Sequence, residues 1–218
     1  RVTEAARQTT SPLVEFQLLR SAEFARLDGG QLDHGTDGMS GPMGRQGCML
    51  DWKIVGPFDN PSMQGYHKRL GPERGEQGPY EGKQTEIDWR TNPPFHRLCR
   101  FDLDHAVQPS TAAVTYLATE ITAERGGEAR LLIGAEGAYK IWVDGELVAR
   151  RPHDISLGYD GQAWSIDLDK GKNQVLIKLA SKSSGDLGLT ARLVDPQLQP
   201  IVDAKFEAAY EFHGKQMD

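Results

Sequence analysis

Aromatic and polar side chains in predicted loops are the part of this sequence that could do chemistry. Flat aromatic rings stack on the C–H faces of sugars, while polar groups bond to the sugar hydroxyls. The candidate ligand-binding residues are Asp59, Asn60, Tyr66, Glu73, Tyr80, Trp89, Arg90, Trp142 and Tyr159. Trp89 and Trp142 have the parity of the polar residues in their predicted strands, so they are the better candidates among the tryptophans for an exposed or ligand-facing role. This set predicts a carbohydrate site on loops and an exposed aromatic face.

Catalytic chemistry is not predicted. The sequence has no G-x-S-x-G motif that would present a nucleophilic serine. A glycosidase needs two carboxyl groups about 5 to 10 Å apart, and segment 56–90 offers Asp59, Glu73, Glu86 and Asp88. Their spacing does not require any two of them to meet, since surface carboxylates are common. We therefore expect no catalytic residue and keep a glycosidase-like hydrolase as the third hypothesis.

Neither a nucleotide nor a metal site is predicted. Segment 29–47 is rich in glycine but lacks the G-x-x-x-x-G-K-[ST] and G-x-G-x-x-G patterns, so it is interpreted as a linker. The cysteines and histidines lack zinc-site spacing. The segment that begins at Asp167 resembles the start of a calcium loop, but Lys178 stands where a bidentate Glu is needed. No cofactor is expected, and a structural calcium held by loop oxygens stays open.

Charge and hydropathy limit the partners. The net charge is −6 over 218 residues with no basic run, which disfavours nucleic acid. No apolar stretch approaches the length of a bilayer span, so membrane insertion is not expected. The first residue is Arg1 and not Met, so we expect a processed chain or a piece of a longer one.

The elements that must position these side chains are mainly strands. From Cys48 onward Leu50, Trp52 and Ile54 alternate with polar residues, which predicts a half-buried strand. Further strands are predicted at 113–122, 128–134, 138–143, 146–150, 162–168, 173–180 and 187–194. Asp144-Gly145 predicts a tight hairpin turn. A helix is predicted at 11–28 and a short one after Pro200. Many short strands without strand–helix alternation predict a mainly β protein, an antiparallel jelly-roll β-sandwich with short flanking helices at both termini.

The predicted organisation has three parts. Residues 1–47 form a helix and a glycine-rich linker, residues 48–195 the sandwich, and residues 196–218 an extension with a short helix. Within the sandwich, residues 56–82 form a long irregular excursion. Cys48 and Cys99 share the parity of apolar neighbours, so both should face the core. Two buried free thiols are the favoured interpretation, and a disulfide between the strands is the alternative.

Four segments carry a family resemblance: "WKIVGPFDN" at 52–60, "YEGKQTEIDWR" at 80–90, "LLIGAEGAYKIWVDGELVARR" at 131–151 and "LDKGKNQVLIKLA" at 168–180. In this order they resemble a jelly-roll β-sandwich module of the galactose-binding-like or protective-antigen-like kind. Such carbohydrate-binding-module-like domains occur in large, often exported, multidomain bacterial proteins. The resemblance covers about 48 to 195. The segment Ala135-Glu136-Gly137 lacks the paired acidic residues that related modules often have, which weakens any carry-over of a calcium or sugar site.

Two functions follow from these observations. The first is a non-catalytic accessory module that binds carbohydrate or a cell-envelope polymer. The alternative is a structural or protein-interaction module that contacts other domains or subunits of a larger assembly. The resemblance favours an extracytoplasmic location.

Overall fold

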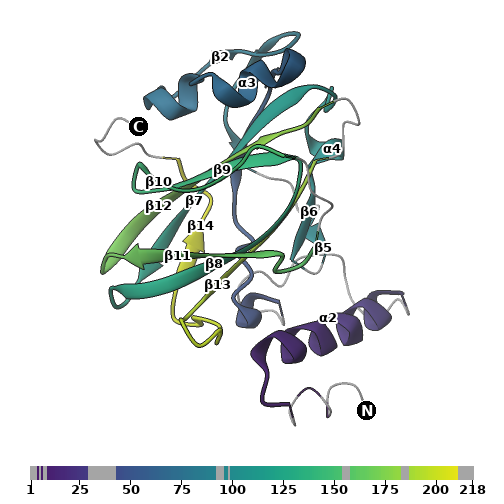
Figure 1. Ribbon diagram of the computed structural model, residues 1–218, viewed down its shortest axis with the longest axis vertical. Helices are drawn as coiled ribbons and strands as arrows, with labels where there is room; N and C mark the ends of the chain where they lie inside the picture. The colour runs from purple at the N-terminus through teal and green to yellow at the C-terminus, as the bar shows by residue number, and fades with distance from the viewer. Residues whose placement is uncertain are drawn as a thin grey trace.

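The computed structural model describes residues 4, 6, 9–28, 43–91, 96–97, 99–153, 158–182 and 187–210. Two antiparallel β-sheets pack face to face and enclose the hydrophobic core between them (Figure 1). This arrangement confirms the predicted mainly β, antiparallel sandwich. Among the described residues, no helix is long and apolar enough to cross a membrane.

The larger sheet has seven strands in the order β10-β9-β12-β7-β1-β4, with β14 also paired to β7. Its strands are β1 (Lys53–Asp59), β4 (Arg90–Thr91), β7 (Ala113–Ala123), β9 (Ala138–Val143), β10 (Glu146–Arg151), β12 (Gly171–Ala180) and β14 (Lys205–Glu207). β1 and β14 lie on the same side of β7 because they pair with different halves of that strand. β7 is therefore the strand around which the sheet is organised.

The smaller sheet has five strands in the order β11-β8-β13-β6-β5. Its strands are β5 (His96–Arg97), β6 (Arg100–Asp102), β8 (Gly127–Glu136), β11 (Gln162–Leu168) and β13 (Gly188–Val194). A short helix, α4 (Leu103–Ala106), follows β6. The strands predicted from alternation are thus present, and their bounds agree closely with the predicted ranges.

The hairpin between β9 and β10 confirms the turn signal. Asp144 has a φ of 49° and Gly145 a φ of 82°, as a type I′ turn requires. The Asp144 carboxylate also accepts a hydrogen bond of 2.7 Å from the backbone N–H of Gln174. The turn is therefore tied to the neighbouring strand β12.

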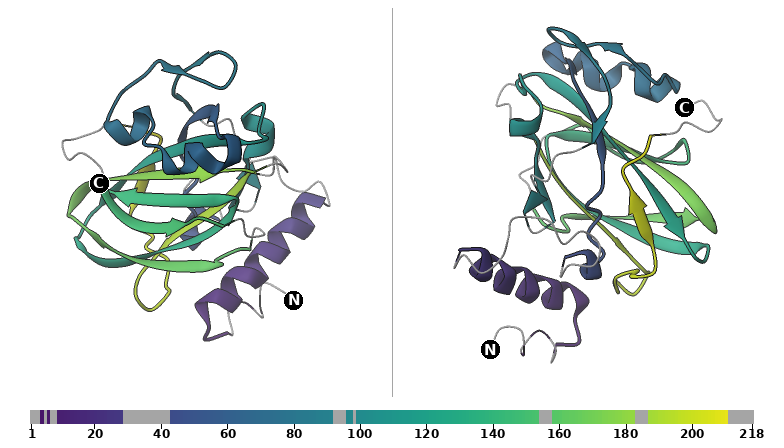
Figure 2. Two further views of the ribbon diagram at one scale, coloured as in Figure 1. Left: turned by 45° about the horizontal axis from the view of Figure 1, so that its top comes forward. Right: turned by 180° about the vertical axis from the view of Figure 1, so that it is seen from behind.

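The excursion after β1 is an ordered cap. It contains η3 (Pro61–Met63), α3 (Gln64–His67), η4 (Gly71–Arg74) and the small hairpin of β2 (Tyr80–Glu81) and β3 (Glu86–Ile87). We call residues 60–89 the cap. It lies across the outer face of the larger sheet, where Figures 1 and 2 show α3 and β2 above the strands. A second hydrophobic cluster fills the space between cap and sheet.

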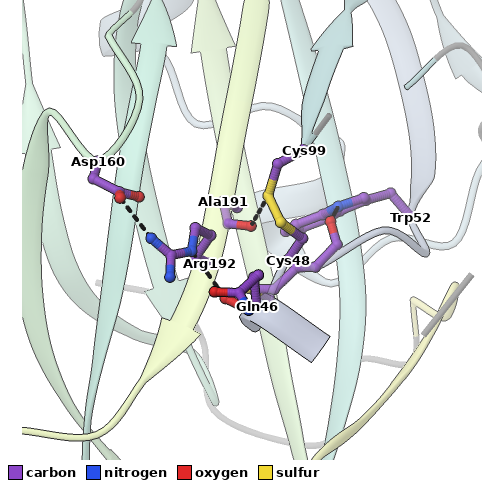
Figure 3. Close-up of a disulfide and its surroundings, with 8 residues drawn as sticks. Gln46, Cys48, Trp52, Cys99, Asp160, Ala191 and Arg192 are labelled. Atoms are coloured by element: carbon purple, nitrogen blue, oxygen red, sulfur yellow. Dashed lines mark hydrogen bonds and ion pairs between the residues drawn. A yellow bond between two sulfur atoms is a disulfide. The ribbon is translucent and has the colours of Figure 1, made fainter. Parts of the chain in front are cut away.

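A disulfide joins Cys48 to Cys99, with a Cα–Cα distance of 5.5 Å (Figure 3). Both residues are buried, as parity predicted, but the favoured interpretation of two free thiols is wrong. The reason is that both cysteines lie along one edge of β13. Cys48 forms a β-bridge with Arg192, while β6, which follows Cys99, pairs with the first half of the same strand.

Helix α2 (Pro12–Asp28) confirms the predicted N-terminal helix. Its Phe16 is fully buried and stacks beneath the guanidinium of Arg192, 3.7 Å from the ring centre. That guanidinium pairs with the Asp160 carboxylate at 2.6 Å. α2 therefore packs on the outer face of the smaller sheet, below the strands in Figure 1. The predicted linker falls largely outside the described residues.

The short C-terminal helix predicted after Pro200 is wrong in the described part of that segment. Lys205–Glu207 is instead strand β14, which pairs antiparallel with β7. Phe206 is buried between two exposed charged neighbours. Pairing with a free stretch of β7 thus outweighs the helical preference of an Ala- and Glu-rich sequence.

Candidate functional site

Three of the predicted aromatic site residues lie buried beneath the cap. Tyr66 is 2% exposed, Tyr80 6% and Trp142 2%. All three belong to the hydrophobic cluster between the cap and the outer face of the larger sheet. The expected exposure of Trp142 is therefore wrong, because the sheet is covered on both faces and polar parity no longer means solvent.

Asn60 is also buried and has a structural role. Its side-chain oxygen accepts a hydrogen bond of 3.0 Å from the backbone N–H of Tyr66. Its amide nitrogen donates to the carbonyl of Ser181 at 2.8 Å. Asn60 thus fastens the first turn of the cap to the residue that follows β12, and these bonds occupy its polar atoms.

Glu73 forms a buried ion pair with Lys178 of β12 at 2.6 Å. The Tyr116 hydroxyl donates to the same carboxylate, and the Lys178 ammonium also donates to the carbonyl of Lys68 at 2.8 Å. Burial lowers the pKa of Lys178 to about 8 against the opposing effect of the Glu73 charge. Burial, together with that same charge, raises the pKa of Tyr116. These groups satisfy one another and leave Glu73 no surface for a ligand.

Four predicted residues keep accessible surface but lie apart. Trp89 is half-buried, stacks on Tyr210 with ring centres 4.3 Å apart and donates its indole N–H to the Tyr80 hydroxyl at 3.0 Å. Arg90 is exposed and pairs in register with Ile54. Asp59 lies five residues further along the same strand, which corresponds to about 17 Å. A single sugar ring does not span that separation.

The fourth accessible residue, Tyr159, lies on the opposite side of the sandwich. Its ring packs against Phe16 of α2. The guanidinium of Arg20 lies over the Tyr159 ring, 4.1 Å from the ring centre. The Asp59 carboxylate forms an ion pair with the Lys83 ammonium at 3.6 Å. The nine predicted residues therefore do not gather in one place.

A cleft of about 410 Å³ lies at one end of the sandwich. It is enclosed by the turn between β7 and β8 and by the loop that leads from β13 to β14. The residues that line it are Ala123, Glu124, Arg125, Gly126, Gly127, Glu128, Ala129, Leu168, Asp195, Pro200, Ile201, Val202 and Asp203. Apolar side chains and charged ones thus share one concave surface.

Polar contacts shape the walls of the cleft and connect them. The Asp195 carboxylate accepts hydrogen bonds of 2.8 Å from the backbone N–H groups of Gln197 and Gln199, which shapes the loop. Arg125 and Asp203 approach across the cleft at 3.4 Å. Glu124 is exposed on the turn, and Glu128 is exposed at the start of β8. The arrangement can accept hydrogen bonds from a polyhydroxylated ligand and donate hydrogen bonds to it, beside apolar side chains.

Sequence patterns did not reveal this cleft. Its walls come from segments about seventy residues apart in the chain, and neither segment carries a motif. The nearest signal was the charged pair Glu124-Arg125 ahead of two glycines, a pattern typical of any exposed turn. Only the pairing of β14 with β7 brings the second wall into place.

No family model matches the sequence, and no curated protein matches it. Among solved structures, similarity extends to a β-glucosidase from Kluyveromyces marxianus in complex with glucose, at 15% identity and a TM-score of 0.43, covering 66% of this chain and 17% of that one. A PA14 sugar-binding domain from an RTX adhesin shares 18% identity at a TM-score of 0.29, covering 37% and 44%. The A domain of epithelial adhesin 9 from Candida glabrata, in complex with Galβ1-3GlcNAc, shares 9% identity at 0.45, covering 77% and 92%.

This chain therefore spans about a sixth of the length of the glucosidase. Likeness at these scores carries no argument about function.

Proposed function

We propose that this chain is a non-catalytic module that binds carbohydrate in the cleft between the β7–β8 turn and the loop before β14. The observation that carries the proposal is that apolar and charged side chains line one concavity of about 410 Å³. Ligand pockets in proteins span about 300 to 1,000 Å³ and pair apolar walls with a few polar groups.

Each part of the cleft matches a part of a sugar. Leu168, Ile201 and Val202 offer apolar surface to the C–H face of a ring. The exposed carboxylates of Glu124 and Glu128 accept hydrogen bonds from hydroxyl groups. The Arg125 guanidinium is held near Asp203 and donates to ring or hydroxyl oxygens.

A binding role is favoured over hydrolysis. A glycosidase acid is usually kept protonated by an apolar pocket, whereas Glu124 on the turn and Glu128 at the start of β8 are both exposed. Asp195 is engaged by backbone N–H groups, and Asp203 lies beside Arg125. This distribution of carboxylates supports recognition of hydroxyl groups without chemistry.

A glycan array followed by affinity electrophoresis in neutral polysaccharides tests the proposal. The variant Glu124→Ala/Glu128→Ala should lose retardation in the polysaccharide that the unmodified chain binds. The control Glu81→Ala/Glu146→Ala removes two exposed carboxylates elsewhere and should leave the mobility shift unchanged. Equal behaviour of the two variants, or absence of binding to any neutral glycan, would contradict a carbohydrate site in this cleft.

We further propose that residues 48–195 form a jelly-roll module of the protective-antigen-like kind within an exported protein, with a cell-envelope polymer as the ligand. The Cys48–Cys99 disulfide supports export, since disulfides persist in oxidising compartments. Secretion of the full-length chain with an export signal, compared with a cytoplasmic form, tests this by the yield of folded, oxidised protein.

A second candidate is a structural or protein-interaction module. The observation that favours it is α2, which buries Phe16 yet leaves Val14 and Phe24 exposed, Phe24 at 58%. Light scattering of the chain and of Phe24→Ser tests self-association through this face. A stable oligomer that the substitution dissolves, together with no glycan binding, would favour this alternative.

A further inference from the structure

Three basic residues stand side by side on the outer face of the larger sheet. Lys178 of β12 lies directly opposite Lys140 of β9, and Lys140 lies directly opposite Arg150 of β10. Residues opposite one another in an antiparallel sheet project from the same face, with Cβ atoms about 4.5 to 5.5 Å apart. The face is the one that the cap covers, because Lys178 bonds to Glu73 and the Lys140 ammonium lies 5.0 Å from the ring centre of Tyr66.

The charge of this row is only partly neutralised. Lys178 has the buried Glu73 carboxylate as its partner. In the described part of the chain, neither Lys140 nor Arg150 has a carboxylate within ion-pair distance. Arg150 is exposed and Lys140 is half-buried, so both reach the border of the cap. Like charges directly opposite one another destabilise a sheet, and this chain carries 31 acidic residues that could have relieved the repulsion.

An aromatic group borders the two free cations. The Lys140 ammonium lies 5.0 Å from the centre of the Tyr66 ring, and Arg150 is the cross-strand neighbour of Lys140. The exposed ring of His67 stands edge-on to Tyr66 with ring centres 5.1 Å apart. Lys140 is thus backed by the Tyr66 ring and half-buried, while Arg150 beside it is exposed to solvent.

We propose that Lys140 and Arg150 form a binding site for a pendant oxyanion, a carboxylate or sulfate, of an acidic polysaccharide. The Arg150 fork can hold two oxygens of one anion, while the Lys140 ammonium supplies a point charge beside it. Two free cations in a chain of net charge −6 suit isolated acid groups along a polymer. A membrane or duplex, whose charge is dense and extended, would meet repulsion from the rest of the surface. The site is distinct from the cleft and goes beyond the function proposed for it.

Affinity electrophoresis in dextran sulfate, polygalacturonate and neutral dextran tests the site and separates sulfate from carboxylate. The unmodified chain should be retarded by at least one of the two acidic polymers. Lys140→Gln/Arg150→Gln should weaken that affinity by about tenfold or more, because two charge-assisted hydrogen bonds are lost. The control Lys170→Gln/Lys205→Gln removes two exposed lysines, so it changes the net charge equally and should keep the affinity.

Three results would overturn the proposal: no retardation by either acidic polymer, an equal loss in the control variant, or tighter binding to phosphatidylserine vesicles or duplex DNA. The cleft variant Glu124→Ala/Glu128→Ala separates this site from the proposed function. It should keep its retardation by the acidic polymer, whereas Lys140→Gln/Arg150→Gln should keep any binding to a neutral glycan. A negative result for one of the two proposed sites therefore does not decide the other.

Discussion

Glu73 of the cap and Lys178 of β12 form an ion pair of 2.6 Å in which both side chains are buried. They are separated by more than a hundred residues, and their bond joins the cap to the sheet at its centre. The pair is therefore one of the polar contacts, beside the Asn60–Ser181 bond, that hold the cap on the larger sheet.

Removing one partner of this pair should be costly. Glu73→Gln leaves the Lys178 ammonium buried without a counter-charge, and such changes destabilise proteins by about 3 to 5 kcal/mol. Glu76→Gln is the matched control, because it breaks the exposed pair with Arg74 at 2.7 Å and should cost less than about 1 kcal/mol. Urea unfolding of both variants measures the difference.

The double variant Glu73→Gln/Lys178→Met should be more stable than Glu73→Gln alone. It removes the unpaired charge, while the side-chain amide introduced by Glu73→Gln still offers an oxygen to the Tyr116 hydroxyl. A double variant that is less stable than Glu73→Gln alone would contradict this explanation. The unpaired charge of Lys178 would then not be the cause of the destabilisation by Glu73→Gln.

The disulfide should contribute strongly to stability. The two cysteines are 51 residues apart, and closing a loop of that length in the unfolded chain corresponds to about 4 kcal/mol. Thermal unfolding with and without reductant should show the loss. A Cys48→Ala/Cys99→Ala variant should be equally destabilised and indifferent to reductant; continued sensitivity there would point to a different cause.

Stability should fall between about pH 10 and pH 12. Burial raises the pKa of Tyr80 from 10.0 to about 12. In that window the unfolded chain has lost the phenol proton and the folded chain keeps it, so each rise in pH favours unfolding. The shift corresponds to about 3 kcal/mol for this group. Urea midpoints across this range should decline less steeply for Tyr80→Phe, and an unchanged slope would contradict the assignment.

Truncation of two phenylalanines on α2 should change stability by very different amounts. Phe16→Ala removes a fully buried ring that stacks on Arg192 and should destabilise by about 3 to 5 kcal/mol. Phe24→Ala truncates an exposed ring on the same helix and should change stability by less than about 0.5 kcal/mol. Chemical unfolding of the pair tests whether α2 is an integral part of the fold.

Alternation of apolar and polar residues was sufficient to predict the strands of the sandwich. Trp52, with the parity of Ile54, lies in the core and donates its indole N–H to the carbonyl of Met49 at 2.8 Å. The Asp144-Gly145 turn was equally predictable, because few residue pairs tolerate two positive φ angles. These features depend on neighbours within one strand or one turn.

Features that depend on distant partners were not predictable. Trp142 has the parity of polar residues in its strand, yet it is buried. The cap covers it, and the cap begins about eighty residues earlier in the chain. Phe206 lies in a strand because β7 is long enough to pair with β14 beyond the end of β1. The cleft also depends on the pairing of β14 with β7, because one of its walls is the loop before β14.

Both ends of the cap enter the same pair of strands: β1 precedes it, β4 follows it, and these strands are bonded to each other at Ile54 and Arg90. Within the cap, the Asn60–Ser181 bond and the Glu73–Lys178 ion pair also tie it to β12 and the residue that follows that strand. Tyr66, Tyr80 and Trp142 can thus become accessible only if the contacts between the cap and the sheet break. The surfaces open to other molecules in the folded protein therefore include Lys140 and Arg150 at the border of the cap. They also include the cleft at the end of the sandwich.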